Sequence, residues 1–596
     1  MTFQILNNEY DGELQFKEYD FELSNFQKWS IDSWRKNKNV LITAHTGSGK
    51  TLPAEDAINQ IISNNLGKVI YTSPIKSLSN DKYNSLKKKF PDADIGIITG
   101  DIKFNPNATV IIMTTEILRN LLYNNKIEDI KNKVTIEINI NEIHTVIFDE
   151  VHYINDVDRG TVWEECFILL PSVVNLICLS ATIDNPEHFC NWLSKIKNKD
   201  IILTSTEKRI VPLRHCIFID YLHSFLNKKE GFSSEDFNNK LITFSDENNM
   251  FNVNEYVRVM NHIKNTQNGM SNNQIINNLI HYLNVNTLTP AIFFVFSRKG
   301  CEKLANSVHH TLLDNIELSL VDKIIKHYLK KTNNYESYIK MKQYKSLRKC
   351  LDKGIAYHHS GLLPIFKELV EILFSYKNID NQPQPLVKVL FATETFAVGV
   401  NMPTKVVIFT SLEKFTNNEM RYLKSHEFLQ MAGRAGRRGI DSSGLVILLP
   451  NMNMLPNEKI IKSMLLGKSQ IIESKFKPNY KIIIKSIING NDISYIVKQS
   501  LVTKELTSQL DEKTTELNKL DFPDIDLEKV NEYIKIKNKD YGYFKPTKKT
   551  LKENSKKIKI LENDTTFMQK YKFYIDNKDI IDTKKKLYTD INNNIN

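Results

Sequence analysis

The chain has 596 residues, of which 41% are hydrophobic and 10% aromatic, enough apolar material for several packed cores. At about 100–200 residues per domain, this length suggests three to five domains. The six cysteines are scattered and form no C-x-x-C pair, which excludes a disulfide framework or a cysteine zinc site as the organising feature. The net charge of +11, with a pI of about 8.9, is compatible with a polyanionic partner.

No apolar run in the sequence is long enough to span a membrane, and the N-terminal residues lack the layout of a secretory signal peptide. We therefore expect a soluble intracellular protein without a membrane partner. Cytoplasm and nucleus remain equally open.

Gln27 is the first candidate site residue along the chain, within F-E-L-S-N-F-Q-K-W-S-I at residues 21–31. A glutamine amide can both donate to and accept from the edge of an adenine, and Phe21 or Phe26 can stack on such a base. A surface glutamine beside core aromatics explains the same pattern equally well, so both interpretations stay open.

A phosphate-binding loop is predicted at residues 40–51, V-L-I-T-A-H-T-G-S-G-K-T, where a β-prone run leads through a glycine turn into a helical pattern. The turn Thr46-Gly47-Ser48-Gly49 lets backbone N–H groups approach phosphates closely. Lys50 would reach the β- and γ-phosphates of ATP, and the Thr51 hydroxyl would bind Mg²⁺. An ordinary glycine turn before a helix is the alternative.

Three further β-prone runs, at residues 69–72, 95–98 and 110–113, are each followed by hydroxyl side chains. Ligands gather at the carboxyl ends of strands in open α/β sheets. A single strand ending in this way is unremarkable, but three in succession suggest a strip of phosphate contacts that includes Lys76, Thr99 and Thr115.

An acidic pair follows the short apolar run at residues 145–148, in T-V-I-F-D-E-V-H. Burial of two adjacent carboxylates is costly without a cation, and Mg²⁺ would compensate them. We expect Asp149 to hold the metal and Glu150 to orient and deprotonate the attacking water. An exposed acidic turn is the usual explanation of such a pair, and the phosphate loop upstream argues against it.

A coupling role is predicted for L-I-C-L-S-A-T, residues 176–182, where another buried strand ends in hydroxyls. Ser180 and Thr182 could bond to Asp149 or His152 and report the state of the nucleotide. For His152 itself, coupling and chemistry are both open.

A second α/β unit begins near residue 289, after a polar, irregular stretch at 216–288 that we interpret as a linker with a small insert. Its last motif is Q-M-A-G-R-A-G-R-R-G. Glycines there let Arg434 and Arg437 project from one tight turn, and two guanidiniums together are typical of a phosphate clamp or arginine finger. A basic surface turn is the alternative.

The ordered set of motifs resembles superfamily II helicases. It consists of A-H-T-G-S-G-K-T, D-E-V-H, S-A-T, A-T-E-T-F-A-V-G-V-N-M-P and Q-M-A-G-R-A-G-R-R-G. More narrowly, S-P-I-K-S-L-S-N, D-E-V-H-Y-I-N-D and H-H-S-G-L-L-P resemble the Ski-type DExH-box RNA helicases that feed the RNA exosome. The resemblance covers about residues 20–450 and fades beyond.

Roles for further residues follow from this resemblance. It implies that Gln430 reaches the γ-phosphate with the two arginines, and that Gly399 and Asn401 lie near the ribose. It also implies that an RNA backbone is held by Lys76, Thr99, Thr115, Ser297 and Thr393. Backbone contacts carry no sequence information, so binding should be sequence-independent and sensitive to salt.

The predicted fold is α/β, with two tandem RecA-like parallel sheets followed by a winged-helix-like and helical extension. The expected boundaries are 1–215 for the first RecA-like domain, 216–288 for the linker and insert, 289–450 for the second RecA-like domain, 451–505 for the winged-helix-like segment and 506–596 for a charged, stalk-like helical tail. The sequence predicts a hairpin about Asn417-Asn418, and the resemblance implies that this hairpin wedges strands apart.

The function that these expectations favour is ATP- and Mg²⁺-dependent unwinding of single-stranded or 3′-tailed RNA. The resemblance implies the 3′-to-5′ direction and an RNA processing or decay complex. A DNA helicase of the same superfamily is the first alternative. An ATP-gated scaffold that clamps RNA without unwinding it is the second.

Overall fold

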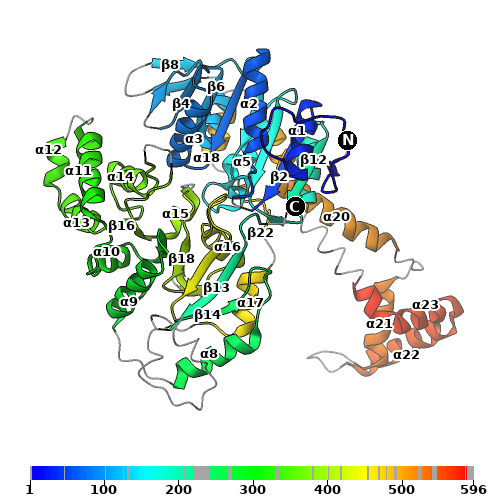
Figure 1. The fold of residues 1–596 in the computed structure, drawn as a ribbon. Helices are drawn as coiled ribbons and strands as arrows, with labels where there is room; N and C mark the ends of the chain where they lie inside the picture. The colour runs from blue at the N-terminus through cyan, green and yellow to red at the C-terminus, as the bar shows by residue number, and fades with distance from the viewer. Residues whose placement is uncertain are drawn as a thin grey trace. The chain divides into compact units, whose positions relative to one another are not determined.

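The computed structural model describes residues 3–45, 47–100, 102–124, 126–129, 134–206, 209–219, 240–265, 271–330, 335–378, 382–399, 402–416, 419–450, 452, 455–467, 470–477, 480–488, 493–519, 526–539, 546–583, 586 and 589. The chain divides into two compact units, Met1–Asn491 and Asp492–Asn596. The first unit contains two large sheets covered by helices, and the second unit is helical (Figure 1). We call each large sheet with its helices a half of the first unit: the first half contains the first sheet, and the second half contains the second sheet.

The first sheet has nine strands in the order β1-β12-β2-β10-β9-β3-β6-β4-β5. All neighbouring pairs are parallel except β4 and β5. The strands are β1 (Phe3–Ile5), β2 (Asn39–Ala44), β3 (Lys68–Ser73), β4 (Ile95–Ile98), β5 (Lys103–Phe104), β6 (Val110–Thr114), β9 (Ile143–Phe148), β10 (Asn175–Ser180) and β12 (Ile201–Thr206).

Helices cover the first sheet, and this explains its strand sequences. Strands buried on both faces read as continuous apolar runs, and β2, β6 and β10 are buried at every position. The helices are α1 (Asn25–Arg35), α2 (Leu52–Asn64), α3 (Lys76–Lys89), α4 (Thr115–Asn124), α5 (Gly160–Leu169) and α6 (Pro186–Lys197). A small antiparallel pair, β7 (Lys126–Asp129) and β8 (Val134–Glu137), follows α4.

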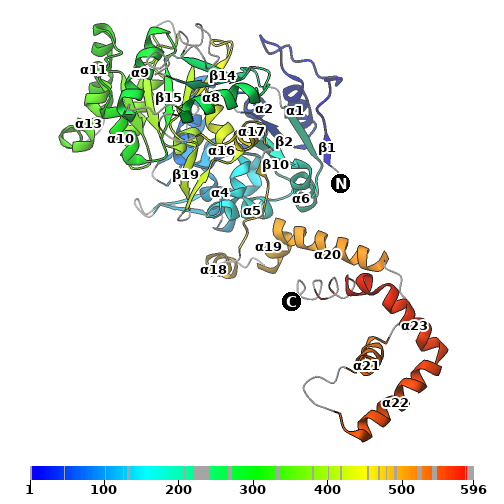
Figure 2. The ribbon, with the colours of Figure 1, turned by 90° about the horizontal axis from the view of Figure 1, so that it is seen from below.

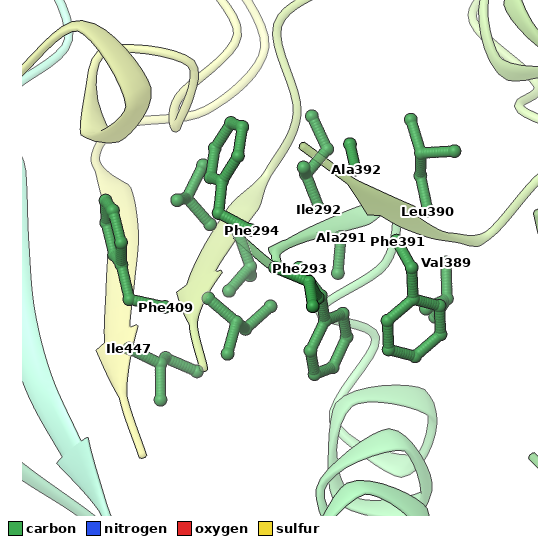
Figure 3. Close-up of a cluster of buried hydrophobic side chains, with 14 of the residues drawn as sticks. Ala291, Ile292, Phe293, Phe294, Val389, Leu390, Phe391, Ala392, Phe409 and Ile447 are labelled. Carbon is green, nitrogen blue, oxygen red and sulfur yellow. The ribbon is translucent and has the colours of Figure 1, made fainter. Parts of the chain in front are cut away.

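The second sheet has seven strands in the order β14-β13-β21-β18-β15-β17-β16, and only β13 with β14 is antiparallel within the described residues. Its core packs aromatic rings on both faces. Phe293 lies 4.8 Å from Phe391 between ring centroids, and Phe294 lies 5.8 Å from Phe409 (Figure 3). The strands are β13 (Leu213–Phe218), β14 (Leu241–Ser245), β15 (Ala291–Phe294), β16 (Ile355–His358), β17 (Val389–Ala392), β18 (Val406–Phe409) and β21 (Gly444–Leu448).

Two parallel α/β sheets confirm the predicted fold class for the core of the chain. The helices of the second half are α8 (Val253–Asn265), α9 (Asn272–Val285), α10 (Arg298–Asn306), α11 (Asn315–Lys330), α12 (Tyr335–Lys340), α13 (Lys342–Leu351), α14 (Pro364–Phe374), α15 (Glu394–Gly399), α16 (Ser425–Ala432) and α17 (Glu458–Leu466). An antiparallel hairpin, β19 (Glu413–Thr416) with β20 (Glu419–Tyr422), precedes α16, and its turn residues 417–418 lie outside the described residues.

The described part of 216–288, which the sequence predicts as a linker and small insert, packs into the core of the second sheet. Phe218, Phe244, Tyr256 and Leu279 are buried in the same core as the central strands. The apolar residues of this stretch are spaced among asparagines and lysines, so only one face of each element is apolar, and the sequence reads as irregular. The core also continues past residue 450, because Ile461 on α17 is fully buried in it.

Residues 470–476, which we call the return segment, pass from the second half back to the first. Strand β22 (Gln470–Ile471) pairs in parallel with β11 (Ile183–Asp184), just after the S-A-T turn. Asn155 donates to the carbonyl of Ile471 at 2.7 Å and accepts from the amide of Glu473 at 2.8 Å. The Ser474 hydroxyl donates to Glu164 at 2.6 Å. The return segment therefore joins the chain after the second sheet to elements beside the D-E-V-H motif.

Helix α18 (Tyr480–Ile488) ends the first unit. The second unit contains α19 (Ile493–Gln499), α20 (Leu501–Lys519), α21 (Leu527–Lys537), α22 (Lys548–Asn563) and α23 (Thr565–Asp576), all helical (Figure 2). Its small core consists of Val530, Tyr533, Phe567, Tyr574 and Ile581. Across the described ranges, no helix combines the length and apolarity that crossing a membrane requires. The winged-helix-like segment stays a prediction.

Candidate nucleotide site between the two sheets

The phosphate loop joins β2 to α2 in the predicted order. Gly47 and Gly49 have φ angles of +85° and +86°, a left-handed conformation that side-chain-bearing residues rarely adopt. Ser48 Oγ donates to the carbonyl of His45 at 2.7 Å and holds the turn closed, while Thr46 lies outside the described residues. Thr51 precedes α2, and Pro53 occupies its first turn, where a missing N–H costs least.

The acidic pair follows β9, a strand next to β10 and β3 and one strand away from β2. Lys50 Nζ donates to Glu150 Oε2 at 2.9 Å, so the loop and the pair meet directly. Asp149 is 4% exposed and accepts from the Tyr71 hydroxyl at 2.6 Å. Glu150 has a φ of +55°, a strained conformation that turns its side chain out of the strand direction.

Burial raises the pKa of Asp149 above its ordinary value, and the neighbouring Glu150 charge acts in the same direction. Burial alone would raise the pKa of Glu150 too, but the Lys50 ammonium outweighs it and lowers that pKa below its ordinary value. The contact with Lys50 therefore keeps Glu150 ionised, and Glu150 can act as a proton acceptor once Lys50 turns to another anion.

A cavity of about 310 Å³ lies between the two halves and brings these groups together. The first half contributes the phosphate loop and the acidic pair, and the second half contributes the turn after α16. The lining includes Gly47, Gly49, Lys50, Thr51, Lys82, Asp149, Glu150, Arg209, Pro403, Arg434, Gly436 and Arg438.

The three arginines of the Q-M-A-G-R-A-G-R-R-G motif have different surroundings. Arg434 is 6% exposed and donates to the carbonyl of Ala397, while its Nε has no hydrogen-bond partner among the described residues. Burial lowers the pKa of Arg434 to about 10. Arg437 instead binds Asp441 through both Nε and Nη2, at 2.8 and 2.9 Å, and does not line the cavity.

Arg438 is the arginine that reaches the phosphate loop, and the motif interpretation did not select it. A Cβ atom added to Gly49 would lie 2.9 Å from Arg438 Nη1 and 2.7 Å from Gln27 Nε2. Arg438, from the second half, and Gln27, the candidate for adenine recognition in the first half, thus both approach Gly49. The run of two arginines, Arg437-Arg438, was visible in the sequence, but which of them faces the cavity depends on the fold of the turn.

Gln27 lies beside the phosphate loop, where it donates to the carbonyl of Gly49 at 3.0 Å. Its Oε1 accepts from the amide and hydroxyl of Ser24, the N-cap of α1, at 3.0 and 2.9 Å. Of the two aromatic candidates, Phe26 is buried in the core, whereas Phe21 is 52% exposed. Phe21 is therefore the ring that remains accessible to a base.

His152 connects the acidic pair to the S-A-T turn. Its Nδ1 accepts from the amide of Ala181 at 3.4 Å and lies 3.4 Å from Glu150 Oε2. Burial lowers the pKa of His152 to about 4, so the ring is neutral near pH 7. The Ser180 hydroxyl is buried without a hydrogen-bond partner in the described ranges, and Thr182 is half-buried.

The strand-end residues proposed for nucleic acid gather at matching edges. β3, β6 and β4 are adjacent and parallel, so Lys76, Thr99 and Thr115 follow neighbouring strand ends. Lys76 is exposed, but Thr99 and Thr115 are only 1% and 0% exposed. Thr99 Oγ1 accepts from the amide of Ile102 at 3.1 Å, and Thr115 Oγ1 donates to the carbonyl of Ser73 at 3.4 Å, so both hydroxyls are turned inward.

The second half has a corresponding edge, because Ser297 and Thr393 follow β15 and β17, which are adjacent and parallel. Ser297 is exposed and accepts from the Gly300 amide at 3.2 Å as the N-cap of α10. Gly399 ends α15, Gln430 is half-buried on α16, and Asn401 lies outside the described residues.

The residues present fit a magnesium triphosphate. The unpaired Nε of Arg434 and the glycine turn are the groups that an anion would satisfy. Mg²⁺ is usually held by one or two carboxylates or hydroxyls together with substrate phosphates, and Thr51 and Asp149 both line the cavity. Among the described residues no cluster of three His, Cys, Asp or Glu side chains could hold a metal by itself.

Residues 24–189 match the DEAD/DEAH box helicase family. This match and the relatives named below support the resemblance of the motifs to Ski-type DExH-box helicases of superfamily II. It is 38% identical to an uncharacterized helicase of Schizosaccharomyces pombe over 86% of this chain and 48% of that protein. It is 37% identical to the exosome RNA helicase MTR4 of Homo sapiens over 78% of this chain and 42% of that protein.

The antiviral helicase SKI2 of Saccharomyces cerevisiae is 36% identical over 81% of this chain and 39% of SKI2. The chain spans less than half the length of each of these three relatives.

Two further residues position the site, and the sequence motifs did not predict either of them. Tyr71 lies inside β3 and fixes Asp149, but an apolar strand gave no reason to single it out. Arg209, in the connection between the sheets, donates to the carbonyls of Gly433 and Ala435 at 2.7 and 2.8 Å and so braces both sides of Arg434.

Proposed function

We propose that this protein is an ATP-dependent RNA translocase that unwinds 3′-tailed duplexes. The observation that carries the proposal is the cavity between the two halves, where Lys50 and Glu150 of one half meet Arg434 of the other. Neither half alone holds a complete set of phosphate-binding and proton-accepting groups. A nucleotide bound there would therefore stabilise one relative position of the two halves.

The chemistry assigned to these residues is positioning and charge stabilisation. Lys50 and Arg434 would neutralise the phosphates from opposite sides, and Glu150, released from Lys50, would accept a proton from the attacking water. Mg²⁺, which we propose is held by Thr51 and Asp149, would supply further neutralisation of the phosphate charge. We also propose that Gln27 recognises adenine, that Gln430 and Arg437 approach the γ-phosphate on closure, and that Gly399 and Asn401 lie near the ribose.

Nucleotide state would be transmitted through His152, which touches both Glu150 and the Ser180–Thr182 turn. The two strand-end edges, one on each half, would grip the nucleic acid backbone. Closing and reopening the cavity would move these edges relative to each other, and repetition would give translocation. The names of the relatives MTR4 and SKI2, which describe an exosome RNA helicase and an antiviral helicase, support an RNA substrate and a decay or processing complex.

A displacement assay on matched duplexes with a 3′ tail, a 5′ tail or no tail tests the proposal. We expect ATP-dependent strand displacement only with the 3′-tailed RNA, and none with Glu150→Gln, a variant that keeps the size of the side chain. Displacement that is faster on the corresponding DNA would favour a DNA helicase. RNA-stimulated ATP hydrolysis without displacement of any duplex would favour the clamping scaffold.

A further inference from the structure

Helix α22 (Lys548–Asn563) carries lysines along one side. Its sequence is K-K-T-L-K-E-N-S-K-K-I-K-I-L-E-N, and none of its residues is buried. Successive residues of an α-helix are about 100° apart and rise about 1.5 Å. On that geometry five lysines fall within an arc of about 100° and along about 16 Å of the helix. We call this set the lysine stripe; it consists of Lys548, Lys549, Lys552, Lys556 and Lys559.

The opposite side of α22 holds the helix in place. Ile558 and Leu561 are half-buried and pack against the core of the second unit. Helix α22 contacts both α21 and α23, so the side that carries Ile558 and Leu561 is occupied (Figure 2), whereas Leu551 and Ile560 are 41% and 69% exposed. The lysine stripe therefore faces away from the packing side, and all five of its lysines are exposed.

The positive charge of the stripe is not neutralised within the described part of the chain, where none of its lysines makes an ion pair. The two acidic residues of α22, Glu553 and Glu562, fall about 40° outside the arc on either side. The sixth lysine, Lys557, projects from the far side of the helix and pairs with Glu532 at 2.8 Å. Lys557 is therefore neutralised by Glu532 on one side of α22, and the five lysines of the stripe leave a net positive charge on the other side.

We propose that the lysine stripe binds the phosphate backbone of single-stranded RNA, as a second contact for the strand that the motor grips. Lysine ammonium groups are flexible point charges that suit a repeating row of phosphates and read no sequence. A protein interface would have aromatic or apolar residues at its centre, and the arc holds only lysines and Asn563. An amphipathic helix on a membrane would present its apolar side, which α22 uses for packing.

The proposal rests on the proposed RNA-translocase function and predicts a dependence on RNA length. A strand bound by the motor is held at a high effective concentration near a second surface on the same chain, so both contacts add to the affinity only if the strand reaches both. A long RNA should therefore bind more tightly than a short one, and the extra affinity should depend strongly on salt.

The test compares three full-length proteins: wild type, a stripe variant with its five lysines changed to glutamine, and a control variant. The control changes five exposed lysines elsewhere in the second unit, Lys498, Lys535, Lys539, Lys572 and Lys578, and so removes the same charge. Affinities for RNAs of about 10 and about 30 nucleotides are measured at several salt concentrations, together with the RNA-stimulated ATPase.

For the stripe variant we expect at least about tenfold weaker binding of the long RNA at low salt, with the salt slope reduced by roughly 0.7 for each lysine that is engaged. Binding of the short RNA and the maximal ATPase rate should stay at wild-type values, and so should the control variant with both RNAs. Wild-type affinity and salt slope of the stripe variant for the long RNA would overturn the proposal, as would an equal loss in the control variant.

This experiment distinguishes a failure of the proposed RNA-translocase function from a failure of RNA binding by the lysine stripe. If wild type shows no RNA-stimulated ATPase, the proposed function fails, whatever the variants do. If wild type is stimulated by both RNAs and the stripe variant binds the long RNA normally, only the role of the stripe is lost.

Discussion

Lys50 Nζ donates to Glu150 Oε2 at 2.9 Å, across 100 positions of sequence. The two side chains are 9% and 20% exposed, so solvent screens the attraction between their charges less than it would at the surface. Each satisfies the other when no phosphate is present. A triphosphate would compete for Lys50 and leave Glu150 as an ionised acceptor beside the cavity. The ion pair with Lys50 thus keeps Glu150 ionised and available as a proton acceptor until a phosphate binds Lys50.

Changing Glu150 to Gln should lower the ATPase rate by on the order of 10²–10⁴ and leave ATP binding nearly unchanged. The amide keeps the volume but cannot accept the proton. Steady-state ATPase and a separate nucleotide-binding titration measure the two effects. Glu142→Gln, which removes the partner of Lys68 on the surface, is the matched control. Normal turnover of Glu150→Gln would rule out the assignment.

Arg438→Ala should raise the KM for ATP several-fold with a smaller change in kcat. Its guanidinium lies at Gly49 and Gln27 rather than beside Glu150, so it would contribute binding more than transition-state stabilisation. Arg434→Ala should instead reduce kcat, because Arg434 is the arginine whose charge is felt by Glu150. ATPase kinetics over a range of ATP concentrations separate the two. A fall in kcat alone for Arg438→Ala would contradict this division.

Shortening the β19–β20 hairpin should spare the ATPase and impair unwinding. Phe415 and Met420 are register partners on the hairpin and are 65% and 59% exposed, although both are large and apolar. Such residues are suited to stacking against the first base pair of a duplex. The double variant Phe415→Ser/Met420→Ser is a milder form of the same change. Equal losses of ATPase and unwinding, or unwinding left intact, would disprove the wedge role.

Lys197→Met should stabilise the protein most at or below neutral pH. Burial lowers the pKa of Lys197 to about 7, whereas the unfolded chain has an ordinary lysine pKa near 10.5. Between those values the unfolded state binds more protons, so wild-type stability from this group rises with pH through that window. We expect the stability gain of Lys197→Met to shrink between pH 7 and 10, measured by urea unfolding. Part of the gain is offset because the amine donates to the carbonyl of Leu170. A gain independent of pH would contradict the shift.

Asn155→Ala should loosen the return segment, because one side chain both donates to Ile471 and accepts from Glu473. Loss of two hydrogen bonds at a partly exposed site should cost about 1–3 kcal/mol of stability. Limited proteolysis should cut the return segment faster in this variant than in wild type. Asn141→Ala, on the surface of the same half, is the control. Unchanged cleavage would show that the segment is held by its strand pairing alone.

Prediction from sequence succeeded where neighbouring residues determine the structure. The phosphate loop needs a strand, two glycines and a helix in immediate succession, and Gly47 and Gly49 have the positive φ angles that the pattern requires. Buried parallel strands are continuous apolar runs, so β2, β9 and β10 were visible in the sequence. The order of the motifs was enough to indicate the helicase family whose model matches residues 24–189.

The described residues between 216 and 288 show where prediction from neighbouring residues fails. Their apolar positions are spread among polar ones, and only packing against the second sheet reveals Phe244 and Leu279 as core. The inward hydroxyls of Thr99 and Thr115 were equally hidden, since a strand-end position does not state which way a side chain turns.

The sequence by itself determined the parallel α/β halves, the phosphate loop and the acidic pair, because each is encoded by a short run whose conformation depends on local propensity and periodicity. Only the tertiary structure decided how the site residues are partnered: that Lys50 pairs with Glu150, that Asp441 holds Arg437, and that Arg438 reaches Gly49 from the other half. The Lys50–Glu150 and Arg438–Gly49 contacts join positions about 100 to 400 residues apart, and their geometry follows from how strands cross over and helices pack, not from the spacing of residues along the chain.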